Sequence, residues 1–275
     1  MVQIIAEAGS NHNGSVAAAV ELVDLASEAG ADVVKFQFIY PENLYLPEFR
    51  DLKNRTENLA FSQRKKEVLS KSDWRAVWAH ASDRGIGITA SVFCSAGLDL
   101  LDQLGATFVK ISSTDLVNTE LIRQAASQFN HVVLSTGMAS LGEIEHTLLS
   151  LEHIRPSPVI SLMHCVSSYP CQFEDSNVKR VSRLRSTFGL ETGYSDHTLG
   201  HESALMALAY GAEFFEKHIT MDKSLPGFDH AHAANTEEFK LYVSLVRSAA
   251  FARGSGTTNE QTDSETKTRA RRGVY

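Results

Sequence analysis

Short apolar runs alternate with amphipathic stretches along the whole chain. The runs are rich in β-branched and aromatic residues, which predicts strands. In chain order they read VQIIAEAG, DVVKFQF, GITASVF, TFVKISS, HVVLSTGM, VISLMHCVS, LETGYSDH and EFFEKHIT. Stretches between them, such as SVAAAVELVDLASEAG, have helical periodicity. Eight strands that each precede a helix predict a single-domain α/β fold, the (β/α)8 or TIM barrel.

Two segments depart from this alternation. Residues 39–72 are long, polar and rich in lysine and arginine, and connections of this length in a compact domain are either functional or disordered. Residues 253–275 have no apolar face, which predicts a loosely held polar tail. We therefore expect the barrel to occupy residues 1–252.

An internal repeat supports the barrel. EAGADVVKFQ, QLGATFVKIS and AYGAEFFEKHI each place a glycine suited to a helix C-cap before an alanine and an apolar strand. Two polar positions recur, five and seven residues after the glycine: Lys35, Lys110 and Glu216, then Gln37, Ser112 and His218. Side chains two apart on a strand share a face, and alternate strands fill common interior layers. These residues are predicted to line the C-terminal mouth, whereas Lys217 faces the helices.

Two inward lysines suggest chemistry at that mouth. An ammonium group there either forms a Schiff base with a carbonyl or binds a phosphate or carboxylate. The alternative, a pair of lysines on the outer surface, conflicts with the face that Lys35 and Lys110 share with Gln37 and Ser112. Glu7, at the end of the first strand, also points inward; it could be a metal ligand, a hydroxyl acceptor, a base, or a structural partner of a lysine.

Two histidines end neighbouring strands. His197 closes GYSDH and His218 closes EKH, and imidazoles that converge in this way commonly bind a divalent metal. Action as an acid or base alone remains the alternative. Ser195 shares the face of His197, while Asp196 points the other way. His230 and His232 also suggest a metal tract, but they belong to a loop with several other uses.

Composition narrows the class of protein. The 275 residues have a formal net charge of -7, which argues against a general nucleic-acid surface. No segment approaches the roughly 20 apolar residues of a membrane span, and the N-terminus lacks a signal-peptide pattern. Three cysteines in no metal or disulfide pattern indicate reduced thiols and a cytoplasmic protein.

Several segments together resemble the sialic acid synthase (N-acetylneuraminate synthase) family. They are IIAEAGSNHNG, GADVVKFQ, FVKISS, VVLSTGM, HCVSSYP, GYSDHT, FEKHIT and LPGFDH, in order along nearly the whole chain. The resemblance implies a transferase that condenses phosphoenolpyruvate with an aldose, N-acetylmannosamine or a related amino sugar, to give a 2-keto-3-deoxy ulosonic acid and phosphate. It also implies a divalent cation, Mn²⁺ in most members with Mg²⁺ or Co²⁺ as alternatives, and it is compatible with a homodimer.

The resemblance also implies roles for individual residues. The phosphoenolpyruvate-binding set would be Lys35, Lys110, Ser113, Ser135 and Ser195, and the metal ligands would be His197 and His218. The sugar-side or acid/base group would be Glu7, Gln37, Tyr169 and Asp229. Of all these, we expect Glu7, Lys35, Lys110 and His218 to act in catalysis.

Three departures from the family pattern concern the sugar side. KISSTD replaces the usual Lys-Ile-Gly-Ser-Gly-Glu, so the shorter Asp115 stands where a sugar-contacting glutamate is usual. Ser167 replaces an asparagine. The chain also stops at Tyr275, where the family continues into a small antifreeze-protein-like domain. We therefore expect an acceptor that differs from N-acetylmannosamine.

Three other functions remain as rivals. A class I aldolase would use Lys35 or Lys110 as a Schiff base. A deoxy-octulosonate or deoxy-heptulosonate phosphate synthase would share the condensation but act on a sugar phosphate. A barrel without catalysis would bind a sugar or phosphoenolpyruvate only, although such a barrel is expected to lose some of these ligands.

Overall fold

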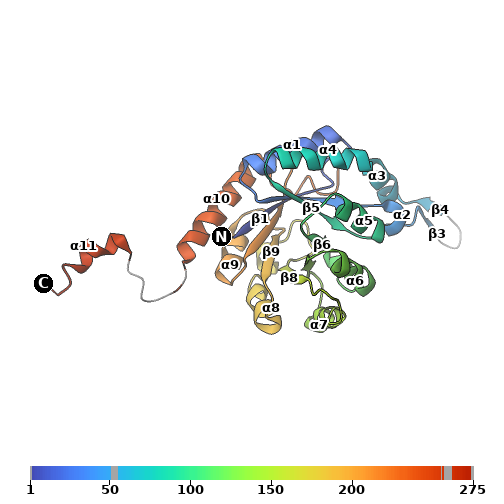
Figure 1. The fold of residues 1–275 in the computed structure, drawn as a ribbon. Coiled ribbons are helices and arrows are strands. Elements are labelled where there is room, and N and C mark those ends of the chain that lie inside the picture. The colour runs from blue at the N-terminus through green and yellow to red at the C-terminus, as the bar shows by residue number, and fades with distance from the viewer. Residues whose placement is uncertain (1, 51–54, 255, 257–261, 274–275) are drawn as a thin grey trace.

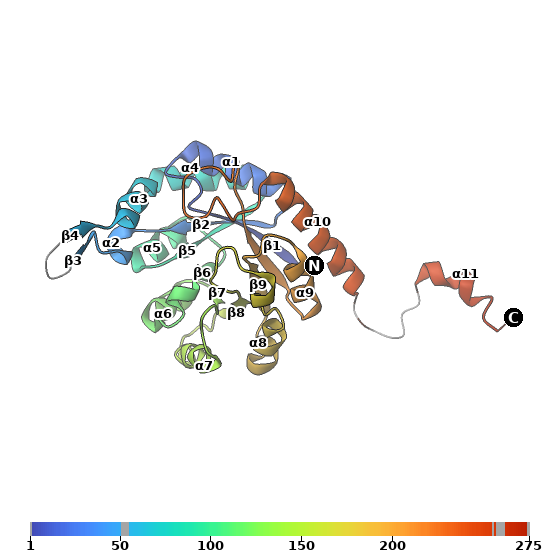
Figure 2. The same ribbon diagram turned by 180° about the vertical axis from the view of Figure 1, so that it is seen from behind.

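The computed structural model describes residues 2–50, 55–254, 256 and 262–273. Eight parallel strands in the described part of the chain close into a barrel, in the order β1-β10-β9-β8-β7-β6-β5-β2. Helices surround the barrel (Figures 1 and 2). The predicted (β/α)8 architecture is confirmed. Among the described residues, no helix is both long enough and apolar enough to cross a bilayer.

All eight strands coincide with the apolar runs in the sequence. They are β1 (Gln3–Gly9), β2 (Val33–Phe38), β5 (Gly87–Val92), β6 (Val109–Ile111), β7 (His131–Ser135), β8 (Val159–His164), β9 (Thr192–Asp196) and β10 (Phe214–His218). The helices that follow them are α1 (Val16–Glu28), α4 (Lys71–Asp83), α5 (Ser95–Gln103), α6 (Thr119–Gln128), α7 (Leu141–Leu149), α8 (Arg180–Phe188), α9 (Glu202–Ala209) and α10 (Thr236–Arg253). Short 3-10 turns, η1 (Ser113–Asp115) and η2 (Phe173–Asp175), lie in the loops after β6 and β8.

The long segment after β2 is folded in its described residues. It contains α2 (Pro41–Leu44), a two-stranded antiparallel sheet of β3 (Glu48–Arg50) and β4 (Arg55–Glu57), and α3 (Leu59–Glu67). Asn58 caps α3 by accepting from the backbone of Ala60 and Phe61. The segment projects from the side of the barrel (Figure 1), and α3 returns the chain to the mouth.

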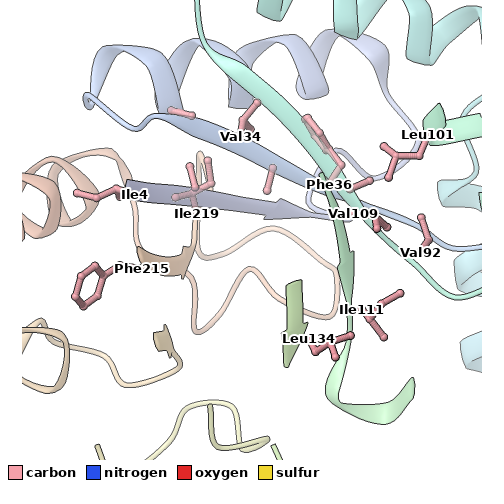
Figure 3. Packing of buried hydrophobic residues seen from close by; sticks show 14 of the residues in the cluster. Ile4, Val34, Phe36, Val92, Leu101, Val109, Ile111, Leu134, Phe215 and Ile219 are labelled. Carbon is pink, nitrogen blue, oxygen red and sulfur yellow. The ribbon is translucent and has the colours of Figure 1, made fainter. Parts of the chain in front are cut away.

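The alternation of each strand separates two kinds of environment. Outward residues such as Val34, Phe36 and Phe215 pack in the layer between the strands and the helices (Figure 3). Inside the barrel, a smaller apolar cluster fills the N-terminal end: Ile5, Val33, Phe108, Val133, Met163 and Phe214. Two residues further along several of these strands the inward side chains become polar, so the C-terminal end is where chemistry is possible.

The glycines of the internal repeat have the expected conformation. Gly30, Gly105 and Gly211 have φ values of 83°, 75° and 95°, in the region that favours glycine. A different glycine makes room inside the barrel: a Cβ on Gly193 would lie 2.4 Å from the ring of Phe214. The repeated glycine therefore ends the helix before each of three strands, β2, β6 and β10.

The C-terminal segment contains η3 (Asp263–Glu265) and α11 (Thr266–Arg269). The ribbon in Figures 1 and 2 shows α11 standing apart from the barrel. Residues 255, 257–261, 274 and 275 of the predicted tail lie outside the described residues.

Candidate active site

A cavity of about 620 Å³ opens at the C-terminal ends of the strands. Thirteen of the residues singled out in the sequence line it: Glu7, Lys35, Gln37, Lys110, Ser112, Ser113, Ser135, Ser167, Tyr169, Ser195, His197, Glu216 and His218. They come from six strands and from the loops that follow β6, β8 and β9. The volume is that of a typical small-molecule site.

An ion-pair cluster forms one wall of the cavity. The Lys35 ammonium lies 2.5 Å from Glu7 Oε2 and 3.5 Å from Glu216 Oε2. Lys35 also donates to Ser91 Oγ at 2.8 Å. All three charged side chains are buried, so each depends on its partners for the solvation it has lost.

The two carboxyl groups of this cluster differ in their pKa. Burial raises the pKa of Glu7, and the attraction of Lys35 does not cancel that effect. Burial also acts to raise the pKa of Glu216, but the Lys35 and Lys110 charges and a hydrogen bond from Ser195 outweigh it and lower the pKa to about 2. Glu216 is therefore the ionised carboxylate, and Glu7 is the one more able to hold a proton.

Lys110 lies in a neighbouring part of the wall. Its ammonium group donates to Ser135 Oγ and, at 3.2 Å, to the carbonyl of Ile111. Burial lowers the pKa of Lys110, although Glu216 opposes that effect. A third inward cation has a carboxylate partner of its own: Arg64 from α3 lines the cavity, pairs with Glu67 at 2.9 Å and stacks on Phe228.

Small polar groups surround the lysines. Ser113 Oγ accepts from the backbone N–H of Gly137 at 3.0 Å. A Cβ on Gly137 would lie 2.6 Å from Ser167 Oγ and 2.7 Å from Ser113 Oγ. Only glycine lets the loop after β7 approach these serines, and this crowded region of hydroxyl and N–H groups suits an anion.

His197 is held in one tautomer. Its Nδ1 lies 2.6 Å from the carbonyl oxygen of Val166 and must donate to it, so Nε2 has the lone pair. Burial lowers the pKa of His197 to about 3, with further lowering by His218. Ser195 Oγ lies 3.2 Å from that Nε2 and donates to Glu216 at 2.8 Å. His197 is thus a neutral imidazole with a free lone pair at the cavity.

His218, Asp229 and His232 form a second group beside it. Their ligand-type atoms all lie within 4.8 Å of one another. His218 Nδ1, Asp229 Oδ2 and His232 Nε2 are buried without a hydrogen-bond partner. The ring of His197 lies 5.7 Å from that of His218, centroid to centroid. Buried lone pairs without donors fit a divalent cation, so these side chains fit the metal that the sequence predicts.

Asp115 does not line the cavity. Its carboxylate accepts hydrogen bonds from Ser112 at 2.8 Å and from Thr114 at 3.0 Å within its own turn. Asp229 is also absent from the lining but reaches the histidine group. Of the departures from the family pattern in this region, Ser167 lines the cavity, and so do Ser112 and Thr114 of KISSTD, whereas Asp115 does not.

The sequence reasoning missed some residues of the site. Arg64 lies on a helix inside the long polar segment, and only the cluster of basic residues in that segment hinted at it. Ser91 sits on β5, facing Lys35, and shares the inward face by the same alternation. His232 was noted in the sequence but set aside.

The mouth of this (β/α)8 barrel combines buried lysines with paired carboxylates and convergent imidazoles. This arrangement suits an enzyme that binds an anionic substrate beside residues able to ligate a metal. The chain belongs to the NeuB family, which it matches over residues 22–258. This membership confirms the predicted enzyme class, a phosphoenolpyruvate-dependent synthase that forms a C–C bond to a sugar.

Individual relatives are similar in sequence to this chain along most of its length. The N,N'-diacetyllegionaminic acid synthase of Legionella pneumophila is 36% identical over 97% of this chain and 77% of its own length. The enzyme of the same name from Campylobacter jejuni is 34% identical over 92% of this chain and 78% of its own. A solved structure of N-acetylneuraminic acid synthetase from Leptospira borgpetersenii covers 99% of this chain and 92% of that one, with 32% identity and a TM-score of 0.87.

Proposed function

We propose that this chain condenses phosphoenolpyruvate with an N-acetylated amino sugar, dependent on a divalent metal, to give a nine-carbon 2-keto-3-deoxy acid and phosphate. The main support is that buried Lys35 and Lys110 share one cavity with Glu216 and the two predicted metal-binding histidines. A cytoplasmic location belongs to the same proposal, because the three cysteines are free thiols.

Phosphoenolpyruvate is assigned to the lysine side of the cavity. Lys110, with Ser135 and Ser113 beside it, offers an ammonium group that forms no ion pair with a carboxylate of the described residues. Lys35 is neutralised in part by Glu216 and Glu7. Because Glu7 holds a proton more readily than Glu216, the two lysines together exceed the negative charge of the two carboxyl groups. The remaining positive charge can bind the phosphate and carboxylate groups.

The bond-forming step follows from the polarity of the substrate. C3 of phosphoenolpyruvate attacks the sugar aldehyde, and positive charge develops at C2, near the ionised Glu216. The aldehyde oxygen gains a proton, for which Glu7 is the available donor. Water then adds at C2 and releases one proton. The C2–O bond to phosphate breaks while the hydroxyl proton on C2 passes to the departing phosphate, which leaves the 2-keto acid.

The metal belongs on the histidine side. His197 and His218 are the residues that would hold it, since His197 has its Nε2 lone pair free and His218 Nδ1 is buried without a partner. When bound, Mn²⁺ or a similar cation supplies Lewis-acid polarisation of the sugar carbonyl. Tyr169, whose ring lies 4.2 Å from that of His197, covers this side of the cavity.

The acceptor sugar is proposed from the relatives and from the altered sugar side. The relatives compared above are named for N,N'-diacetyllegionaminic acid and N-acetylneuraminic acid. Candidate acceptors are therefore N-acetylmannosamine and the six-carbon diacetamido sugar from which the diacetylated acid is built. Ser167 in the cavity favours an acceptor other than N-acetylmannosamine, because serine is shorter than the asparagine of the family pattern.

The test is phosphate release from phosphoenolpyruvate with Mn²⁺ across a panel of N-acetylated and plain aldoses. We expect release that requires both metal and sugar and that is lost in His218→Ala. The best sugar would define the product. No release with any aldose, from a folded chain that binds phosphoenolpyruvate, would contradict the proposed condensation. If N-acetylmannosamine were used as efficiently as the best other sugar of the panel, the proposal of a different acceptor would be wrong.

A Schiff-base aldolase is the second candidate, and the lowered pKa of buried Lys110 favours it, since a less basic amine attacks carbonyls more readily at neutral pH. Borohydride added during turnover with pyruvate would trap an adduct on Lys110 if this mechanism operates. Mass spectrometry of the intact chain would then show the added mass in the wild type and not in Lys110→Met. We expect no adduct.

A further inference from the structure

A histidine that sequence reasoning set aside lies inside the candidate metal site. His232 belongs to the loop between β10 and α10. Its Nε2 is one of the three ligand-type atoms that lie within 4.8 Å of one another, with His218 and Asp229. Its ring is 5.2 Å from the ring of His218 and 5.0 Å from that of Tyr169.

The carboxylate of Asp229 separates the two imidazoles. One of its oxygens lies 3.8 Å from His218 Nδ1, and the other lies 3.8 Å from His232 Nε2. Both separations exceed the 2.7–3.2 Å of a hydrogen bond. Ligands bind a transition metal at about 2.0–2.2 Å, so two ligands of one ion lie at most about 4.4 Å apart. The observed spacing is therefore too wide for direct contact and suits atoms that share an ion.

The neighbouring histidine of the same loop shows the opposite pattern. His230 uses both ring nitrogens: Nδ1 lies 2.7 Å from Thr220 Oγ1, and Nε2 lies 3.0 Å from Asn13 Nδ2. By contrast, His232 Nε2 is buried without a hydrogen-bond partner. Of the two loop histidines, one is a structural residue and the other places an unpartnered ring nitrogen beside His218 and Asp229.

We infer that His232 is a direct metal ligand, because it forms a group of two imidazoles and one carboxylate with His218 and Asp229. This inference rests on the metal dependence in the proposed function, and it adds a third imidazole to His197 and His218, the two histidines named there. Imidazole donors select first-row transition ions over Mg²⁺, which prefers an all-oxygen shell. His232 thus strengthens the preference of this site for Co²⁺ or Fe²⁺ over Mg²⁺.

The test is metal binding without substrates. Isothermal titration with Co²⁺ and with Mg²⁺ would compare wild type, His232→Ala, His232→Gln and His197→Ala, with His153→Ala as an exposed-histidine control. We expect both His232 variants to bind Co²⁺ about 10- to 100-fold more weakly, with little change for Mg²⁺, while the control matches wild type. Pulsed EPR of the Mn²⁺-loaded chain should count one fewer coordinated histidine nitrogen in His232→Ala.

The inference and the proposed function can fail separately. Unchanged Co²⁺ affinity and an unchanged nitrogen count in folded His232 variants would overturn the inference, even if the chain condenses phosphoenolpyruvate with a sugar. Loss of affinity in His197→Ala alone would overturn it as well. Weakened binding in the His232 variants would uphold it, even if no sugar releases phosphate.

Discussion

Strand β10 places two buried lysine–carboxylate clusters on its opposite faces, and they differ in how completely their charges are satisfied. Outside the barrel, Lys217 pairs with Asp196 at 3.2 Å and donates to the carbonyl of Thr198 at 2.7 Å. Thr198 in turn donates its N–H and hydroxyl to the other oxygen of Asp196. The ring of Tyr242 lies 5.1 Å from the Lys217 ammonium and completes the enclosure. Every charge of the outer cluster has a fixed partner.

The inner cluster, one residue away along the strand, is open. Glu216 faces Lys35 and lies in the wall of a cavity of about 620 Å³. Lys110, also in that wall, donates to a serine and a carbonyl and pairs with no carboxylate in the part of the chain that the structure describes. The two clusters show that buried charge alone does not identify an active site. Charge that borders a cavity and lacks a full set of partners does.

The largest expected effect is on catalysis, from the inner cluster. Glu216→Gln keeps an acceptor for Ser195 but removes the negative charge near C2, so kcat should fall about 10²- to 10³-fold. The midpoint of urea unfolding should fall by less than in a variant of the outer pair, because Lys35 keeps Glu7 at 2.5 Å. Steady-state phosphate release and unfolding curves on one preparation would test both statements. Wild-type kcat in Glu216→Gln would remove this carboxylate from the chemistry.

The next effect is on stability, from the outer cluster. Asp196→Ala leaves the buried Lys217 ammonium without its carboxylate, and breaking a buried pair in this way costs about 3–5 kcal/mol of unfolding free energy. The double variant with Lys217→Met removes both charges and should recover much of that loss. Urea unfolding of the two single variants and the double variant measures the coupling. Additive losses would show that the pair contributes no coupling energy.

A third effect comes from buried histidines away from both clusters. Burial lowers the pKa of His12 to about 4 and of His164 to about 4. The unfolded chain binds protons at these residues below pH 6.5 and the folded chain does not, so stability falls as the pH drops. From pH 7.5 to 5.5 each histidine should cost about 1.4 kcal/mol. The loss of unfolding free energy between these two pH values should be smaller by that amount in His164→Asn. The same loss in His164→Asn as in wild type would contradict the lowered pKa of His164.

The smallest effect is expected from Asp115. Its carboxylate closes on its own turn and does not line the cavity. Asp115→Glu should therefore change kcat/KM for the sugar by roughly twofold at most, within about 0.5 kcal/mol. Initial rates over a range of sugar concentrations measure this. A tenfold rise in kcat/KM would show that the side chain reaches the sugar during turnover.

Strand periodicity was enough to predict the fold and the inner cluster. The apolar runs and the glycine repeat placed Lys35, Lys110 and Glu216 on one face, because a period of two fixes the direction of every side chain on a strand. The same alternation separated Lys217 from its neighbours. Predicting the direction of these side chains required no knowledge of the loops.

Residues on loops and inserted helices were beyond that reasoning. His232 and Arg64 reach the site from the loop after β10 and from α3, where no period relates sequence position to direction. In the 3-10 turn η1, Asp115 accepts a hydrogen bond from Ser112. This local hydrogen bond fixes the direction of the side chain, and strand alternation does not predict it. Sequence therefore predicted the wall of the cavity better than its rim.

The role of the inner cluster as the anion site is tested most directly by phosphoenolpyruvate binding. Isothermal titration would measure it in Lys110→Met and Lys217→Met side by side. Loss of a charge-assisted hydrogen bond costs about 1.5–3 kcal/mol, so Lys110→Met should weaken binding roughly 10- to 150-fold. Folded Lys217→Met should bind as wild type does. If Lys110→Met binds phosphoenolpyruvate as tightly as wild type, or if both variants lose it equally, the inner cluster is not the anion site.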